Sequence, residues 1–297
     1  MSSLNKKIDF AIIMQVIKAN PNGDPLDSNR PRVDFNGFGE ISDVCLKRKI
    51  RDRAIDDGMP IFVVSAEKET DGCKSLHDRF DSYVKKGGAT DVLSLCQQWY
   101  DVRAFGQVFA FKSKEKAGKD KDSGKPAGVS IPVRGPVTIQ CATSLEPVSV
   151  SSIQITKSVN SETTDDGKKS TDTMGMKHRI DKGTYVAYGA ISPQLAEKTG
   201  FSYDDALVLK NLLKKLFDGD ASSARPEGSM TVKYLIWWEQ DSSNTVHSSY
   251  KVHQSLRQIL TSASGEDLEK ILCDKSVLQS KLDSAFTDLK PEISEGN

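Results

Sequence analysis

The chain has 297 residues, of which 37% are hydrophobic and 28% charged, a composition that supports a folded globular core and excludes disordered and fibrous classes. Forty-one Lys and Arg residues balance 41 Asp and Glu residues, so net charge does not make the whole molecule a nucleic-acid binder, and any polyanion site must be local. The five cysteines are scattered and form no CxxC pair, which argues against zinc and a disulfide framework.

The first predicted element is a buried central strand over residues 8–17, an apolar, β-branched run that ends at a Pro/Gly loop. The run is too short to span a bilayer, and no cleavable signal precedes it. A cytoplasmic protein without membrane contact is therefore expected.

Residues 20–53 are the most chemically specific stretch. A loop rich in proline and glycine carries amide and guanidinium donors at Asn20, Asn22, Asn29, Arg30 and Arg32.

The next element is a helix over 42–57, capped by Ser42 and ending near Gly58. Its buried stripe is predicted at every fourth residue from Leu46 through Ile50 to Ala54. Beside that stripe lie three cations: Lys47, Arg48 and Arg51. With the preceding loop they predict a cradle for a phosphate backbone, the alternative being a solvated helix face after a structural loop.

Residues 60–128 are less patterned. They predict a short strand over 61–65, a helix over 91–100 and a lysine-rich loop over 112–125. Strand-like runs follow at 129–141, 149–156 and 183–191, and the polar stretch 158–178 predicts a long hairpin tip.

The second half contains a well-marked helix over 203–217, capped by Ser202 and ended by Gly219, then a strand over 229–240. Of Trp237 and Trp238, one is expected in the core and the other exposed or at an interface. Tyr185 and Tyr188 are expected on opposite faces of their strand. A helix-rich region over 251–290 precedes an acidic tail.

Without the insertions, the element order is strand, helix, strand, strand, helix, strand. This order predicts an α+β fold with a ferredoxin-like (RRM-like) sheet, used by many RNA-binding modules.

The hairpin ends in a second candidate contact. Met174 and Met176 flank a glycine and precede Lys177, His178 and Arg179. A soft apolar tip followed by cations is suited to wedging against bases while gripping phosphates, unless the hairpin folds back and buries its methionines.

Enzyme motifs are absent from the sequence: it contains no GxSxG, HExxH or P-loop pattern. The four histidines lie far apart in the sequence, and each is expected to be a surface or packing residue.

Several stretches carry a family resemblance: Asn20-Pro-Asn-Gly-Asp-Pro25, Asn29-Arg-Pro-Arg32, Ile41-Ser-Asp-Val-Cys-Leu-Lys-Arg-Lys-Ile-Arg-Asp-Arg53, Asp101-Val-Arg-Ala-Phe-Gly106, Gly135-Pro-Val137, Met174-Gly-Met-Lys-His-Arg179 and Trp237-Trp-Glu239. Together they resemble the backbone subunit of CRISPR Cascade surveillance complexes, type I-C in particular. The resemblance covers most of residues 8–250.

This resemblance implies a hand-shaped molecule whose copies polymerise along the CRISPR RNA. It implies these parts: a first half of the palm at 1–59, a helical fingers insertion at 60–128, palm strands at 129–155, a thumb hairpin at 156–178, a second half of the palm at 179–250, and a C-terminal helical region with an acidic tail at 251–297. The cradle and hairpin cations would hold the RNA backbone, and Met174 or Met176 would displace a base.

The implied function is non-catalytic RNA binding in antiviral defence, without cofactor or metal. The implied partners are the CRISPR RNA, the target DNA strand that pairs with the guide, further copies of the chain, and the large, small and guide-end-capping Cascade subunits.

Two alternatives remain. One is an RNA-processing endonuclease with His178 or His77 as general base and Lys47 or Arg51 stabilising charge. The other is an RNA-binding protein that does not polymerise.

Overall fold

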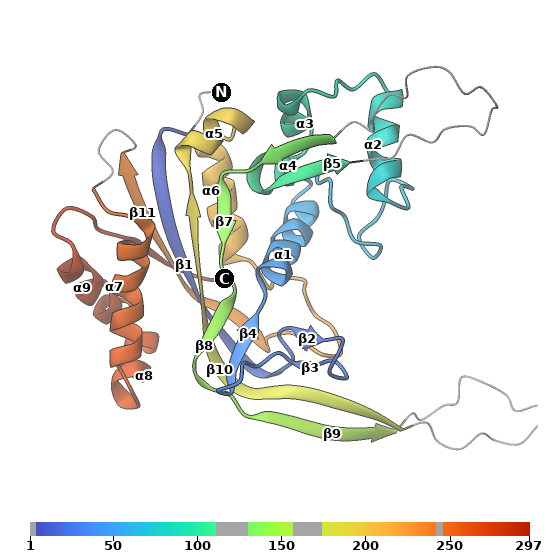
Figure 1. Ribbon diagram of the computed structural model, residues 1–297. Coiled ribbons are helices and arrows are strands. Elements are labelled where there is room, and N and C mark those ends of the chain that lie inside the picture. The colour runs from blue at the N-terminus through green and yellow to red at the C-terminus, as the bar shows by residue number, and fades with distance from the viewer. Residues whose placement is uncertain (1–3, 111–129, 157–173, 242–245) are drawn as a thin grey trace, which may run out of the picture.

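The computed structural model describes residues 4–110, 130–156, 174–241 and 246–297. Its centre is an antiparallel sheet with the strand order β12-β11-β1-β10-β8-β4, and β7 and β9 also pair with β10 (Figure 1). The strands of this sheet are β1 (Lys6–Ala19), β4 (Phe38–Ile41), β7 (Val137–Ile139), β8 (Ala142–Pro147), β9 (Val150–Thr156), β10 (Met174–Ile191), β11 (Met230–Asp241) and β12 (Glu292–Glu295).

Strand β1 lies in the middle of the sheet and is buried on both sides, as the apolar run predicts. Phe10 and Ile12 face one hydrophobic cluster, while Ala11 and Ile13 face another. Successive side chains of a strand point to opposite faces, so a continuous apolar run requires cover on both.

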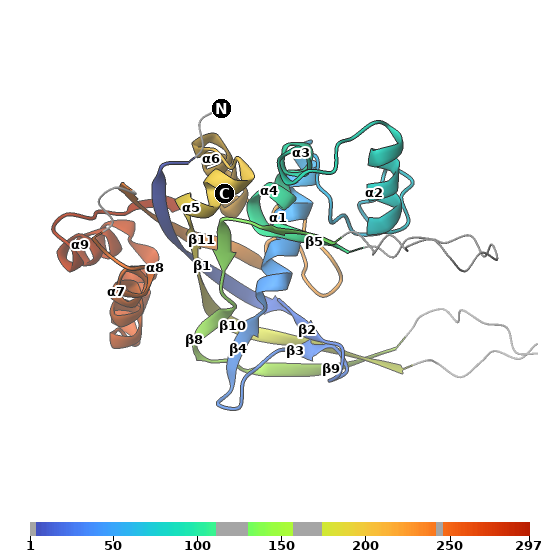
Figure 2. The same cartoon turned by 45° about the horizontal axis from the view of Figure 1, so that its top comes forward.

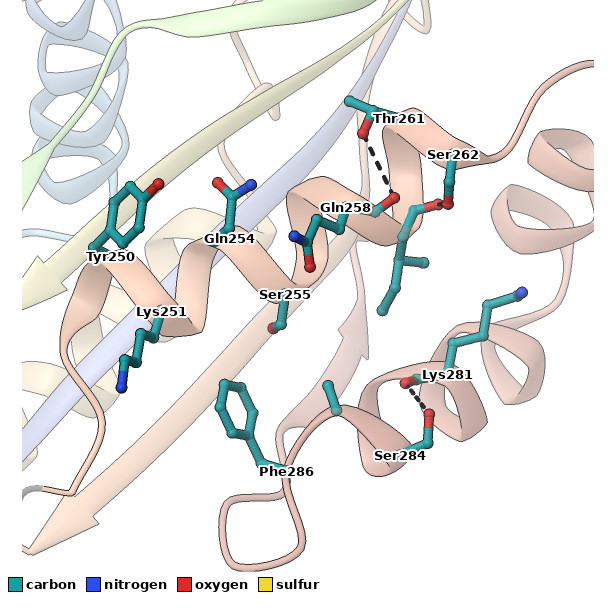
Figure 3. Close-up of a pocket in the computed structure, with 12 residues that line it drawn as sticks. Tyr250, Lys251, Gln254, Ser255, Gln258, Thr261, Ser262, Lys281, Ser284 and Phe286 are labelled. Atoms are coloured by element: carbon teal, nitrogen blue, oxygen red, sulfur yellow. Dashed lines mark hydrogen bonds between the residues drawn. The ribbon is translucent and has the colours of Figure 1, made fainter.

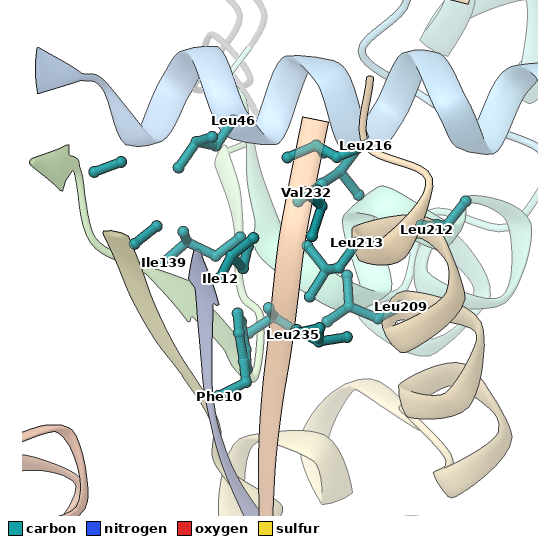
Figure 4. Packing of buried hydrophobic residues seen from close by; sticks show 14 of the residues in the cluster. Phe10, Ile12, Leu46, Ile139, Leu209, Leu212, Leu213, Leu216, Val232 and Leu235 are labelled. Carbon is teal, nitrogen blue, oxygen red and sulfur yellow. The ribbon is translucent and has the colours of Figure 1, made fainter. Parts of the chain in front are cut away.

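Three helices cover the front face: α1 (Asp43–Asp56), α5 (Pro193–Thr199) and α6 (Tyr203–Lys214). The predicted stripe Leu46, Ile50 and Ala54 is buried, and Figure 4 shows Leu46 of α1 and Leu213 of α6 directed toward the strands from their two helices. Both predicted N-caps are confirmed, since Ser42 accepts from Cys45 N and Ser202 forms a capping box with Asp205.

The back face is covered by α7 (Ser249–Ser262), α8 (Glu266–Cys273) and α9 (Lys275–Ala285), drawn in orange and red in Figure 1. This cover corrects the tryptophan prediction. Trp237 is 2% exposed in the front cluster and Trp238 is 1% exposed in the back cluster. They point to opposite faces, and so do Tyr185 and Tyr188 as predicted, but both faces are core.

A second, smaller hydrophobic core is formed by segments that follow α1 and precede β7 in the sequence. It is formed by α2 (Leu76–Lys85), α3 (Val92–Gln98), α4 (Tyr100–Phe105) and the hairpin of β5 (Gly106–Ala110) with β6 (Ser130–Arg134). The expected strand over 61–65 is wrong. The backbone N–H groups of Phe62 and Val63 donate to the carboxylate of Asp101 instead of to a neighbouring strand.

Strands β9 and β10 form a hairpin that extends beyond the sheet, with Met174 opposite Thr156. Residues 174–178, expected in the hairpin tip, belong to β10, because they continue the ladder with β9. The rest of the expected tip and the lysine-rich loop lie outside the described residues.

The end of one helix and the C-terminal tail also differ from expectation. Helix α6 stops at Lys214, before Gly219, and the acidic tail forms β12, which pairs with β11 at the sheet edge. In the part of the chain that the structure describes, no helix combines the length and the apolar character needed to cross a membrane.

Candidate nucleic-acid interface

The loop over residues 20–32 is fixed to the start of α1. Asn22 Oδ1 accepts hydrogen bonds from Ser42 N and Ser42 Oγ, both at 2.9 Å. This amide therefore orients the residue that caps α1, while its Nδ2 group donates to Gly23 O at 3.4 Å.

The other asparagines also shape the loop. Asn20 is buried and donates from Nδ2 to Asn29 O at 2.7 Å, and Asn29 has a left-handed backbone with φ 59°. A short two-stranded ladder of β2 (Gly23–Asp24) and β3 (Arg30–Pro31) brings Arg30 and Arg32 out of this turn. Arg32 is held by Asp24 at 3.4 Å.

The predicted cations of α1 do lie together on one helix, but each already has a carboxylate partner. Lys47 contacts Asp43 at 3.1 Å and Arg48 contacts Asp52 at 2.7 Å, both one helical turn apart. Such partly exposed pairs are worth about 0–1 kcal/mol, so a phosphate can displace the carboxylates at small cost.

Arg51 is different because its partner is in the core. Arg51 Nε donates to Asp101 Oδ2 at 2.9 Å, and the Arg51 side chain also packs over the Phe105 ring. Asp101 is 1% exposed. The sequence could not show this, since the two residues are 50 positions apart.

The loop meets the β9–β10 hairpin through a short hydrogen-bonded chain. Arg30 Nη2 donates to Ser152 Oγ at 3.0 Å, and Ser152 Oγ lies 2.8 Å from His178 Nδ1. Because the serine oxygen accepts from Arg30, its proton is available to the imidazole. Two segments predicted separately as binding elements are thus in direct contact.

Two hairpin cations, Lys177 and Arg179, make no ion pair among the described residues, and Arg179 Nε is buried without a hydrogen-bond partner. The nearby carboxylate of Asp181 is occupied by Lys18 at 2.5 Å and by Ser151. These hydrogen bonds keep the pKa of Asp181 below its usual value. Positive charge at the hairpin base is therefore less compensated than on α1.

The methionines do not fold back. Met174 is 67% exposed and Met176 is 55% exposed, and they share one face of β10 with His178. Ile153 and Ile155 of β9 are also exposed, opposite Lys177 and Gly175 on the other face. The sequence marked these isoleucines only as strand residues, although their alternation with polar neighbours is consistent with a solvent-facing row.

In both overall views the hairpin and the α2–α4 region project to the same side of the sheet, with α1 between them (Figures 1 and 2). The β2–β3 loop lies against the hairpin. The segments that carry the predicted binding residues, namely the β2–β3 loop, α1 and the hairpin, thus share one side of the molecule.

The histidines required by an endonuclease do not assemble into a site. His178 is buried and bonded to Ser152, while His77 of α2 pairs with Asp81 one turn away. Among the described residues, no group of His, Cys, Asp and Glu side chains has metal-site geometry.

The stretch Asp101–Gly106 is explained by packing. Arg103 makes two hydrogen bonds to the Asp205 carboxylate, at 3.0 and 2.7 Å. A Cβ atom on Gly106 would lie 2.4 Å from Val133 O, and one on Gly135 would lie 2.3 Å from Ala104 O. Glycine is required where these two backbones touch.

A family model described as CRISPR-associated protein Cas7 matches residues 6–276, which is most of the chain and includes α1, the hairpin and all strands of the sheet except β12. The chain belongs to the Cas7 family. A curated Cas7 protein from Haloferax volcanii is 27% identical over 247 residues, covering 79% of this chain and 71% of that protein.

The fold is shared with a chain of known structure. A chain of a CRISPR RNA-guided surveillance complex matches with a TM-score of 0.50 and 14% identity, covering 98% of this chain and 89% of that chain. A chain of a pre-nicking surveillance complex gives a TM-score of 0.48 and 14% identity, covering 94% and 87%. The family resemblance is confirmed, as is a mixed α+β fold built on an antiparallel sheet.

Proposed function

We propose that this Cas7 protein is a non-catalytic backbone subunit of a type I-C surveillance complex, that it binds the CRISPR RNA, and that copies of it line up along that RNA. Family membership and the fold shared with a surveillance-complex chain support this proposal. Through the guide, the assembly would present bases to a target DNA strand.

The palm we propose is the ferredoxin-like part of the sheet. The order β11-β1-β10 followed by β7 and β8, with α1 and α6 on one face, is that expected of a βαββαβ unit. We assign the fingers to residues 60–128 and the thumb to residues 156–178. The separate core of α2–α4 supports the fingers, although β6 (Ser130–Arg134) joins that core beyond residue 128. The projecting ladder supports the thumb, although it begins at Val150 of β9.

One observation carries the RNA-binding assignment: Arg30 donates a hydrogen bond to Ser152, which in turn is hydrogen-bonded to His178. It places a cation-bearing loop on the same hairpin face as the exposed Met174 and Met176. Phosphate-binding donors beside exposed apolar side chains suit an RNA strand that is gripped by its backbone and unstacked at one position.

The predicted binding residues differ in whether a carboxylate already holds them. Lys177, Arg179 and Arg30 are without a carboxylate partner in the described chain, whereas Lys47 and Arg48 must leave one to reach a phosphate. We assign the main phosphate contacts to the hairpin base and a secondary contact to α1. Arg51, Asn22 and His178 act by holding the loop, the helix cap and the hairpin in place.

The test compares two charge-matched double variants, Arg30→Gln/Arg179→Gln and Lys47→Gln/Arg48→Gln. Binding of a guide-length RNA is measured by fluorescence anisotropy over a salt titration, with thermal melting to verify folding. The hairpin pair is expected to lose more affinity and to flatten the salt slope by about 1.4, or about 0.7 per lost contact. A greater loss from the α1 pair would contradict this ranking, and unchanged binding by both would contradict the interface.

The partners we propose are further copies of the chain and the large, small and guide-end-capping subunits of the complex. Acids outnumber lysines over residues 264–297 by eight to four, while cations outnumber acids over residues 30–53 by seven to four. This separation of charge supports head-to-tail contacts between copies.

A further inference from the structure

A groove of about 730 Å³ lies on the back face of the molecule, between α7 and the end of α9. Figure 3 shows Phe286 projecting toward α7 across this groove, opposite Ser255. The front cluster and the whole sheet separate the groove from α1, so it is independent of the interface described above.

The groove is cationic. Lys251 and Lys281 contribute to its lining, and neither makes an ion pair or hydrogen bond through its ammonium group within the described part of the chain. No Asp or Glu lines it, and α7 contains no acidic residue at all. The neighbouring carboxylate of Asp288 is bound by His247 at 2.9 Å, which holds the pKa of Asp288 below its usual value.

An exposed aromatic ring borders the same groove. Tyr250 is 71% exposed, beside Lys251 and one helical turn from Gln254. Gln258 continues the row of side-chain amides along α7. Tyr250 also borders a smaller hollow of about 310 Å³ whose lining includes Arg257, and the Arg257 guanidinium packs over the Tyr188 ring.

We propose that this groove binds a single strand of nucleic acid other than the guide. Unpaired lysines suit a phosphate backbone, an exposed tyrosine offers a stacking platform, and the amides accept any base edge. A duplex would leave the tyrosine without a base to stack on, and an apolar protein partner would leave the lysines uncompensated. An acidic protein segment would pair with the lysines but would leave the Tyr250 ring without a stacking partner.

The test uses the full chain and a short oligonucleotide containing 5-iodouracil. After irradiation, peptide mapping locates each adduct, so the back groove and the hairpin are read separately. We expect an adduct at Tyr250. Tyr250→Phe should keep the α7 adduct, while Tyr250→Ala should lower its yield about tenfold, the effect of losing one stacked base.

Charge is tested with Lys251→Glu and with the control Lys198→Glu, which alters another exposed lysine on a different helix. Lys251→Glu is expected to reduce the α7 adduct and its salt dependence, and Lys198→Glu to change neither. Adducts confined to the hairpin would overturn the groove assignment while leaving the proposed function intact. Protection of α7 from hydrogen exchange by a polyglutamate peptide but not by the oligonucleotide would also overturn it.

Discussion

The carboxylate of Asp101 joins three segments of the front face. It accepts hydrogen bonds from the backbone of Phe62 and Val63 and from the guanidinium of Arg51. A buried carboxylate is tolerated only when it is fully hydrogen-bonded and paired with a cation. Arg51 therefore stabilises the contact of α1 with α4 and with residues 62–63, whatever it contributes to RNA binding.

Arg51→Ala is expected to lower the free energy of unfolding by about 3–5 kcal/mol, because it leaves Asp101 buried without its cation. Arg48→Ala is the matched control on the same helix, since its ion pair with Asp52 is exposed, and should cost about 0–1 kcal/mol. Guanidinium unfolding measures both. Equal losses would mean that the Asp101 contact does not carry the stability assigned to it.

The buried side chain of His253 makes the stability of the folded chain depend on pH. Burial lowers its pKa below the ordinary 6.5, with the charge of Asp9 opposing the shift, and the ring contacts Gly189 O at 3.0 Å. A base whose pKa is lowered on folding binds its proton more readily in the unfolded chain. Stability is then fully present above about pH 6.5 and falls as the pH drops below it.

Thermal melting of the wild-type chain between pH 7.5 and 5.5 should show this loss, and His253→Gln should show a shallower dependence over the same window. His77→Gln serves as the control, because His77 is partly exposed on α2. An identical slope in wild type and His253→Gln would rule out His253 as the source.

The β9–β10 hairpin is the element on which most of the functional account depends. Because side chains alternate between the two faces of a strand, Met174 and Met176 lie on the face that holds His178, and Ile153 and Ile155 lie on the opposite face. All four side chains are exposed, so their replacement should leave the fold intact while changing what each face can contact.

The base-displacing role is assigned to the methionine face. With RNAs carrying 2-aminopurine at successive positions, the wild-type protein should raise the fluorescence at the unstacked position. Met174→Ser/Met176→Ser should abolish that signal, and Ile153→Ser/Ile155→Ser should preserve it. The reverse pattern would move the wedge to the isoleucine face. The single methionine variants then show which residue acts.

Local signals predicted many of the elements. The apolar run of β1, the Ser42 and Ser202 caps and the stripe on α1 need only periodicity and capping chemistry. The errors required knowledge of distant partners. Residues 61–65 read as a strand because Asp101, their hydrogen-bond acceptor, lies 38 to 39 positions away.

For the candidate site, too, local signals were predicted from the sequence and distant contacts were not. Its cations were identified by type and spacing, but their partners were not. The pairing of Arg51 with Asp101 and the contact of Arg30 with Ser152 join residues 50 and 122 positions apart. Only tertiary structure shows that the first cation is committed to the core and that the second reaches the hairpin.

At the scale of the whole molecule, the two faces of the sheet carry different chemistry. The front side combines α1, the α2–α4 region and the hairpin, and we propose that it binds the guide (Figure 2). The back side carries the α7–α9 groove, assigned to a second strand. A chain with balanced total charge can serve both because its unpaired cations are local.

The central claim is that copies of this chain line up along a guide RNA without cutting it. Native mass spectrometry of the protein assembled on RNAs of increasing length tests it most directly. We predict particles whose protein copy number rises stepwise with RNA length and whose RNA stays intact. A single protein copy on every RNA, or shortened RNA in the particle, would contradict the account.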